Sequence, residues 1–194
     1  MERKTARGNP VATKSRLTAG NAHAVEFLTL AQHALKKHYF PRVAACLAQL
    51  GESDIWWRPN GASNSAGNLA LHLAGNARQW IASGLGGAPD VRKRDEEFQE
   101  QGPIASKILV AHLQKQVRAA CEVIATLTPD DLRTEYTIQK FHVTGMNAIQ
   151  HVVEHFAYHT GQIVYVTKLR LGVDLGFTRL PSEKKQKRPK LPTL

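Results

Sequence analysis

The chain of 194 residues is long enough for one domain with a sizeable core and too short for two. Hydrophobic residues make up 42% and charged residues 22%, which excludes a disordered or fibrous class. The formal net charge of +10 lies mostly at the two ends. Residues 1–20 hold five Lys or Arg against Glu2 (net +4) and residues 179–194 hold six against Glu183 (net +5), so the rest carries only +1.

Both ends lack hydrophobic periodicity and contain prolines. We therefore expect disordered basic tails over 1–20 and 179–194, flanking one folded domain over 21–178. Basic tails are usually just solvated, and they also permit weak, salt-sensitive contact with nucleic acid. With neither an apolar stretch of about 18 residues nor a secretory signal, the sequence predicts no membrane span and a cytoplasmic location.

The first predicted helical region runs from Ala22 to Leu50, as one long helix or two abutting ones. Pro41 is the expected break or kink, and Gly51 ends the region. Cys46 in this region, and Cys121 further on, both lie in apolar helical patterns without a nearby second cysteine. This pattern predicts buried free thiols rather than a disulfide or metal ligands.

The segment 54–60 reads as an ordered loop in which Trp56 and Trp57 pack onto the core. A second helix is predicted from the run of N-cap residues at 63–65 through Ile81, ending at the glycines that begin with Gly84. His72 falls near the middle of this helix.

The charged segment 90–101 has no apolar stripe and is interpreted as an exposed crossover connection. Pro103 is expected in the first turn of a third helix. Its predicted apolar face comprises Ile108, Leu109, Leu113, Val117, Ala120, Ile124 and Leu127.

A connection through Tyr136, Ile138 and Phe141 leads to a fourth helix. This connection can adopt an extended conformation. Thr144 is its predicted cap, and it runs to about Leu171 before Gly172. Four amphipathic segments without a convincing pair of alternating strands predict an all-α four-helix bundle with a crossover connection.

The fourth helix carries His151, His155 and His159, spaced by four residues each. Successive members lie about 40° apart around the helix and about 6 Å along it, so each adjacent pair can chelate one ion. The outer pair is about 12 Å apart along the axis, too far to share one metal. Helical geometry therefore leaves two choices open, His151 with His155 or His155 with His159.

A two-histidine helix needs a third ligand, and His72 lies mid-helix on another predicted bundle segment. Three imidazoles leave coordination positions open for water or substrate, as in catalytic sites. Residues 151–155 also match the HxxEH pattern of inverse zincin peptidases, with Glu154 as general base. That mechanism needs a further acidic ligand downstream, where the chain offers only Asp174 and Glu183, so we reject it.

The segments Asn64-Ser-Ala-Gly-Asn-Leu-Ala-Leu-His-Leu-Ala-Gly-Asn76 and His151-Val-Val-Glu-His-Phe-Ala-Tyr-His-Thr-Gly-Gln-Ile163 resemble the DinB-like superfamily of helical metalloproteins. The resemblance covers about residues 25–178 and is most specific in the HxxxHxGQ segment. The superfamily includes bacillithiol and mycothiol S-transferase-type proteins. Its ligand pattern, carried onto this chain, implies His72, His155 and His159 as metal ligands.

With these ligands the resemblance implies a divalent metal ion, zinc or nickel. Around them we expect His151, Gln162 and Asn76 as supporting residues, with Trp57 and Tyr158 as candidate pocket residues. The implied activity is metal-dependent transfer of a low-molecular-weight thiol to an electrophile, with a hydrolase less favoured. The alternative is a metal-binding stress protein without turnover, and in either case the family implies a homodimer.

Overall fold

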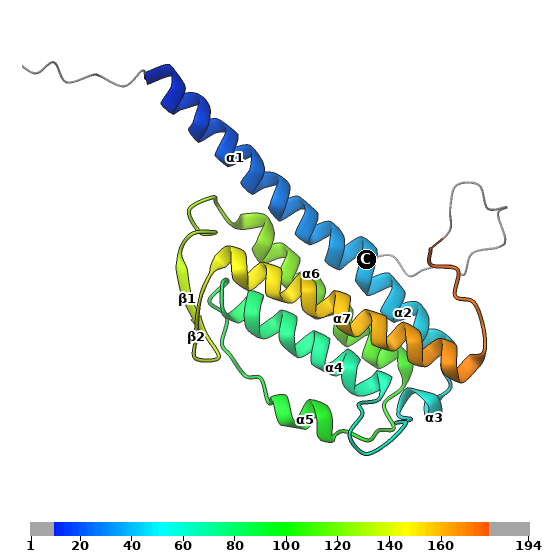
Figure 1. The fold of residues 1–194 in the computed structure, drawn as a ribbon. Helices are drawn as coiled ribbons and strands as arrows, with labels where there is room; N and C mark the ends of the chain where they lie inside the picture. The colour runs from blue at the N-terminus through cyan, green and yellow to red at the C-terminus, as the bar shows by residue number, and fades with distance from the viewer. Residues whose placement is uncertain (1–9, 179–194) are drawn as a thin grey trace, which may run out of the picture.

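The computed structural model describes residues 10–178, with side chains described from Gly20 onward (Figure 1). Helix α1 (Pro10–His33) continues through a π-helical segment (Ala34–Tyr39) into α2 (Phe40–Gln49). Pro41 lies in the first turn of α2, directly after the π-helical segment, and the chain stays helical through it. Of the two expected arrangements over Ala22–Leu50 the structure therefore shows one long helix, which is irregular at the π-helical turn before Pro41 and is not broken there.

The start of α1 differs from the predicted boundary of the N-terminal tail. Residues 10–20, expected to be disordered, form the first turns of α1, which projects away from the remaining helices in Figure 1. Pro10 suits a first helical position, and Ala, Lys, Arg and Leu in the next turns favour helix despite the lack of an apolar stripe. Residues 1–9 and 179–194, where the other tail expectations fall, lie outside the described residues.

The segment directly before the two tryptophans forms one short turn of helix, α3 (Glu52–Ile55), whereas the sequence predicted a loop from residue 54 onward. Arg170, near the end of the last helix, α7 (Gly145–Leu171), contacts this region. Its guanidinium lies 4.7 Å from the centroid of the Trp57 ring, and its Nη2 is 2.7 Å from Asp54 Oδ1. Trp56 packs against the core, as predicted, whereas Trp57 is half-buried and packs against Arg170.

Helix α4 (Ala66–Ala77) begins at the predicted run of cap residues. Ser65 Oγ accepts a hydrogen bond from the Asn68 backbone N–H at 3.1 Å, and Asn68 Oδ1 accepts one from the Ser65 backbone N–H at 3.2 Å. This reciprocal arrangement is a capping box with Asn in place of the usual Glu or Gln. The helix continues through a π-helical segment (Arg78–Ser83) to the glycines.

The crossover connection holds a helix that the sequence did not predict, α5 (Arg94–Gln99), in which no residue is buried. Helix α6 (Ser106–Thr126) starts after Pro103, so Pro103 precedes the helix instead of lying in its first turn. Five of its predicted core positions are buried and Leu127 packs against the core, but Ile108 is 56% exposed.

The expected extended connection is a hairpin of β1 (Glu135–Ile138) and β2 (Phe141–Thr144), with Tyr136 opposite Val143. Helix α7 (Gly145–Leu171) follows directly. Thr144 Oγ1 caps it by accepting a hydrogen bond from the Asn147 backbone N–H at 3.2 Å, and Gly172 ends it with a φ of 65°. Both predicted ends of this helix are confirmed.

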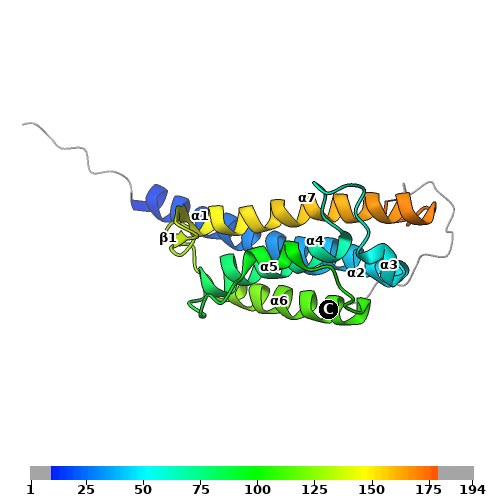
Figure 2. The same ribbon diagram turned by 90° about the horizontal axis from the view of Figure 1, so that it is seen from below.

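The bundle is layered as seen in Figure 2, with α6 and α7 on opposite sides and α2 and α4 between them. Each inner helix contacts both outer ones. The core between them contains Leu35, Phe40, Leu73, Leu113 and Phe156, all fully buried. This all-α four-helix bundle confirms the predicted fold class, and within residues 10–178 no helix is long and apolar enough to cross a membrane.

Cys46 and Cys121 are buried free thiols, as predicted. Burial raises the pKa of each to about 11. Neither side chain is therefore an activated thiolate near neutral pH.

Candidate metal centre

Helix α7 brings His155 and His159 together through its own periodicity. Their ring centroids lie 4.5 Å apart, one turn from each other, and both rings face His72 of α4. His159 is 9% exposed, and its Nδ1 lies 2.7 Å from Gln162 Oε1. Because an amide oxygen only accepts, Nδ1 carries the proton and Nε2 keeps a free lone pair.

Helix α4 supplies the third histidine across the bundle. The ring centroid of His72, which is 4% exposed, lies 4.8 Å from that of His155 and 5.2 Å from that of His159. One ligand nitrogen from each of the three histidines lies within 4.8 Å of the other two. Two nitrogens bound to one ion at about 2.1 Å lie at most about 4.2 Å apart, so the rings would have to move slightly closer to share an ion.

The protonation state of His155 also fits a metal ligand. Burial, followed by the nearby imidazoles of His159 and His72, lowers its pKa to about 3, so the ring is neutral at physiological pH. Its Nε2 is buried and has no hydrogen-bond partner among the described residues. Such an orphaned atom costs about 1–3 kcal/mol, a cost that a bound cation removes. The three histidines can therefore hold a metal ion.

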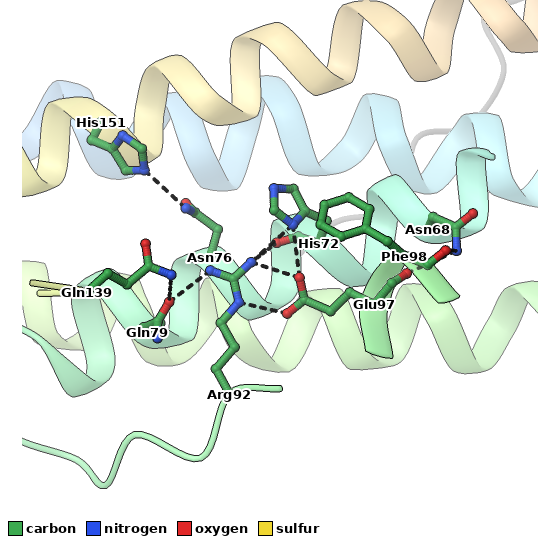
Figure 3. Close-up of polar contacts among 9 residues, drawn as sticks. All are labelled: Asn68, His72, Asn76, Gln79, Arg92, Glu97, Phe98, Gln139 and His151. Carbon is green, nitrogen blue, oxygen red and sulfur yellow. Dashed lines mark hydrogen bonds and ion pairs between the residues drawn. The ribbon is translucent and has the colours of Figure 1, made fainter. Parts of the chain in front are cut away.

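His72 makes further contacts to the crossover connection, shown in Figure 3. Its Nδ1 lies 2.9 Å from Glu97 Oε2, and Arg92 pairs with both carboxylate oxygens of Glu97 at 2.7 Å. Burial raises the pKa of Glu97, but hydrogen bonds from Arg92 and His72 outweigh it and hold the pKa below its usual value. The carboxylate is therefore ionised and accepts from His72, an arrangement common behind metal-bound histidines.

Sequence reasoning missed Glu97 and Arg92, because segment 90–101 has no apolar stripe and reads as a solvated linker. Gly75, one turn after His72 on α4, could have indicated that another segment lies close against this helix. A Cβ at this position would lie 2.8 Å from Glu97 Cδ and 2.9 Å from Arg92 Nε. Only glycine leaves room for the ion pair to lie against the helix.

The connection is held on α4 by side-chain amides and a guanidinium. Asn68 Nδ2 donates to the carbonyls of Glu97 and Glu100, at 3.0 and 2.7 Å. Arg58 Nη2 donates to the carbonyl of Phe98 at 2.8 Å and to Asn68 Oδ1 at 2.8 Å. Because α5 buries no residue, these polar contacts and the Arg92 pair determine its position.

The three residues expected to support the histidine cluster, Gln162, Asn76 and His151, make different contacts. Gln162 bonds to His159, whereas Asn76 lies one turn beyond His72 and donates to His151 Nε2 at 3.1 Å instead of contacting a ligand histidine (Figure 3). His151 stacks on Trp80, with ring centroids 3.9 Å apart. His151 is thus outside the three-histidine cluster and packs beside it.

The peptidase arrangement finds no support in the geometry. Glu154 is exposed and accepts a hydrogen bond from Gln150 Nε2 at 2.9 Å along the outer face of α7. A general base would have to face the metal.

Tyr158, the other candidate pocket residue, is 65% exposed and packs edge-on against His159, with ring centroids 4.9 Å apart.

A cavity of about 450 Å³ lies behind the Arg92–Glu97 pair, between α4, α5 and α6. Arg78, His112 and Gln116 contribute to its wall, and none of the three clustered histidines does. The cavity is therefore separate from the three-histidine cluster.

Comparison with known proteins gives the fold a class. The chain resembles the crystal structure of a DinB-like protein from Bacillus cereus with a TM-score of 0.52 and 19% sequence identity, covering 69% of this chain and 87% of that one. At this identity the likeness shows the fold alone. This is a DinB-like helical bundle with a three-histidine cluster that can hold a metal ion.

Residues 22–181 match the family described as "Protein of unknown function (DUF1572)", and the chain belongs to that family. No curated protein matches the chain at a significant level. The matched region covers the whole four-helix bundle, and the family description names no activity.

Proposed function

We propose that His72, His155 and His159 bind one divalent ion, zinc or nickel. The observation that carries this proposal is the convergence of three ligand nitrogens within 4.8 Å, one of them a buried and unpartnered Nε2 of His155. An all-imidazole set is suited to either metal. Three protein ligands leave room for an exogenous ligand, as catalytic sites require.

On this metal site we propose transfer of a low-molecular-weight thiol to an electrophile. A bound metal ion lowers the pKa of a coordinated thiol, so that the thiolate exists at neutral pH. The thiolate sulfur forms a bond to an electrophilic carbon, which expels its leaving group with the bonding electrons. The chain's own cysteines are buried with raised pKa values, so the thiol comes from a small molecule.

Metal content and thiol consumption test the two steps separately. Elemental analysis of the purified protein is expected to give one zinc or nickel per chain, and none in His159→Ala. Thiol consumption with an aryl chloride should be lost on adding a chelator and in the same variant. Absence of metal overturns the site, whereas bound metal without any chelator-sensitive rate across several thiols overturns the transferase.

A second candidate is a metal-binding stress protein without turnover. The observation in its favour is that Glu97, the carboxylate hydrogen-bonded to a ligand histidine, is already paired with Arg92. It is therefore not free to act as a general base, which also makes a hydrolase the weaker proposal.

We further propose a homodimer formed through α7. Tyr158, Tyr165 and Leu169 follow one another at spacings of seven and four residues along one face and are 65%, 69% and 56% exposed. Tyr165→Glu is expected to shift the mass measured by light scattering from dimer to monomer; a monomeric parent protein would contradict the proposal.

We also propose weak nucleic-acid contact through the basic ends, 1–20 and 179–194. Deletion of both ends should abolish this binding.

A further inference from the structure

His72 Nδ1 has two neighbours of opposite hydrogen-bonding character. Glu97 Oε2 lies 2.9 Å away and can only accept, whereas Arg92 Nη2 lies 3.1 Å away and can only donate. A neutral imidazole carries one N–H, so Nδ1 can satisfy only one of these neighbours at a time. The choice decides whether the other ring nitrogen, Nε2, holds a lone pair or a proton.

The two outcomes have opposite consequences for metal binding. With Nδ1–H donating to Glu97, the lone pair of Nε2 is free, and Figure 3 shows this second nitrogen pointing away from Glu97 toward α7. With Nδ1 accepting from Arg92, Nε2 carries the proton and cannot coordinate an ion.

The existing contacts favour the first outcome because the donors of Arg92 already have other acceptors. Its Nε and Nη2 each bond to Glu97 at 2.7 Å, and its Nη1 bonds to Gln79 Oε1 at 3.0 Å. The second hydrogen of Nη2 can bond to the backbone carbonyl of His72, 3.4 Å away, in place of Nδ1. The Arg92 side chain is only 3% exposed and that of Glu97 12%, so water does not readily replace either partner.

The structure assigns to Glu97 and Arg92 opposed roles at His72: Glu97 holds the tautomer that binds metal, and Arg92 imposes the other tautomer when Glu97 is absent. Both are positioning residues, since neither is among the three clustered histidines. The inference rests on the proposed metal site and deepens it. It makes the crossover connection, held on α4 by Asn68 and Arg58, a determinant of metal affinity.

The experiment compares a single and a double variant of similar volume. In Glu97→Met, Arg92 is the remaining partner at Nδ1, and zinc affinity measured by competition with a chelator should fall about 10- to 100-fold. In the Arg92→Met/Glu97→Met protein the opposing donor is gone as well, and affinity should recover by about tenfold relative to the single variant. A purely structural role for the pair predicts that the double variant is no better than the single one.

The tautomer itself is read in the metal-free protein by NMR of ¹⁵N-labelled histidine. The wild type should show His72 protonated at Nδ1, the single variant should show it protonated at Nε2, and the double variant should show no fixed preference. Glu96→Met is the control, since Glu96 is exposed and pairs with the exposed Lys93; it should match the wild type.

Two results would overturn the inference: Nδ1 still protonated in Glu97→Met, or a double variant that binds zinc no more tightly than the single one. If the single variant does not fold, the tautomers of the wild type and the double variant decide the question. A wild type that shows the Nδ1 proton and yet binds no metal would refute the proposed function and leave the assignment of the two partners intact.

Discussion

Helix α7 and the region of α4 with its crossover connection contribute to the histidine cluster in different ways. On α7, the four-residue spacing of His155 and His159 places both rings on one face, and Gln162 orients the second from within the same turn. On α4, His72 depends on Glu97, which is 25 residues away in sequence. One side of the site is therefore built by local helical geometry and the other by tertiary contacts, and the two should fail in different ways.

The largest effect is expected on α7 itself, where two neighbouring histidines can be compared. His155→Ala should reduce bound metal to near zero, because it removes a ligand and therefore costs more than the about 10- to 100-fold attributed to an outer partner. His151→Ala should retain a full complement, since that ring packs on Trp80. Elemental analysis after dialysis measures both. Loss of metal in both variants would assign the ligands to His151 and His155, because His155 belongs to both possible pairs.

A pair of helical glycines separates the two regions more finely. Gly75→Ala places a Cβ against Glu97 and Arg92 and should destabilise the fold by about 1–3 kcal/mol while weakening zinc binding. Gly161→Ala lies on α7 with no atom within 4 Å of the added Cβ and should stabilise by up to about 1 kcal/mol. Denaturant unfolding of the metal-free proteins gives both values. Equal effects would mean that the connection does not pack on α4 as described.

The smallest effect concerns pH. The pKa of His155 is lowered by burial from 6.5 to about 3, so between these values the unfolded state binds a proton that the folded state does not. The contribution of His155 to the stability of the metal-free protein should therefore be fully present above pH 6.5 and be lost progressively as the pH falls below it.

A difference between two histidine variants isolates this contribution. His155→Gln should reduce the slope of the unfolding midpoint between pH 6.5 and 4.5, before the ordinary pKa of Glu97 is reached. His142→Gln, at an exposed position on β2, should leave the slope unchanged. An unchanged slope in both variants would show that His155 is not buried as a neutral base.

The sequence by itself determined the features that depend on local rules. Period 3.6 in the apolar residues, the caps at Ser65 and Thr144 and the stop at Gly172 placed the main helices, and the HxxxH spacing made a chelating face on α7. Helical geometry could not choose between the two histidine pairs; the resemblance to a known superfamily did so, and it supplied His72.

Tertiary structure alone decided how His72 is held. Three contacts of Glu97 join segments far apart in sequence: its ionised carboxylate bonds to His72, it pairs with Arg92, and its backbone carbonyl accepts a hydrogen bond from Asn68. A polar segment such as 90–101 has no periodicity to reveal which of its charges are solvated and which are buried against another helix. The physical reason is that burial, and with it the choice of hydrogen-bond partner, is a property of the packed bundle and not of the segment.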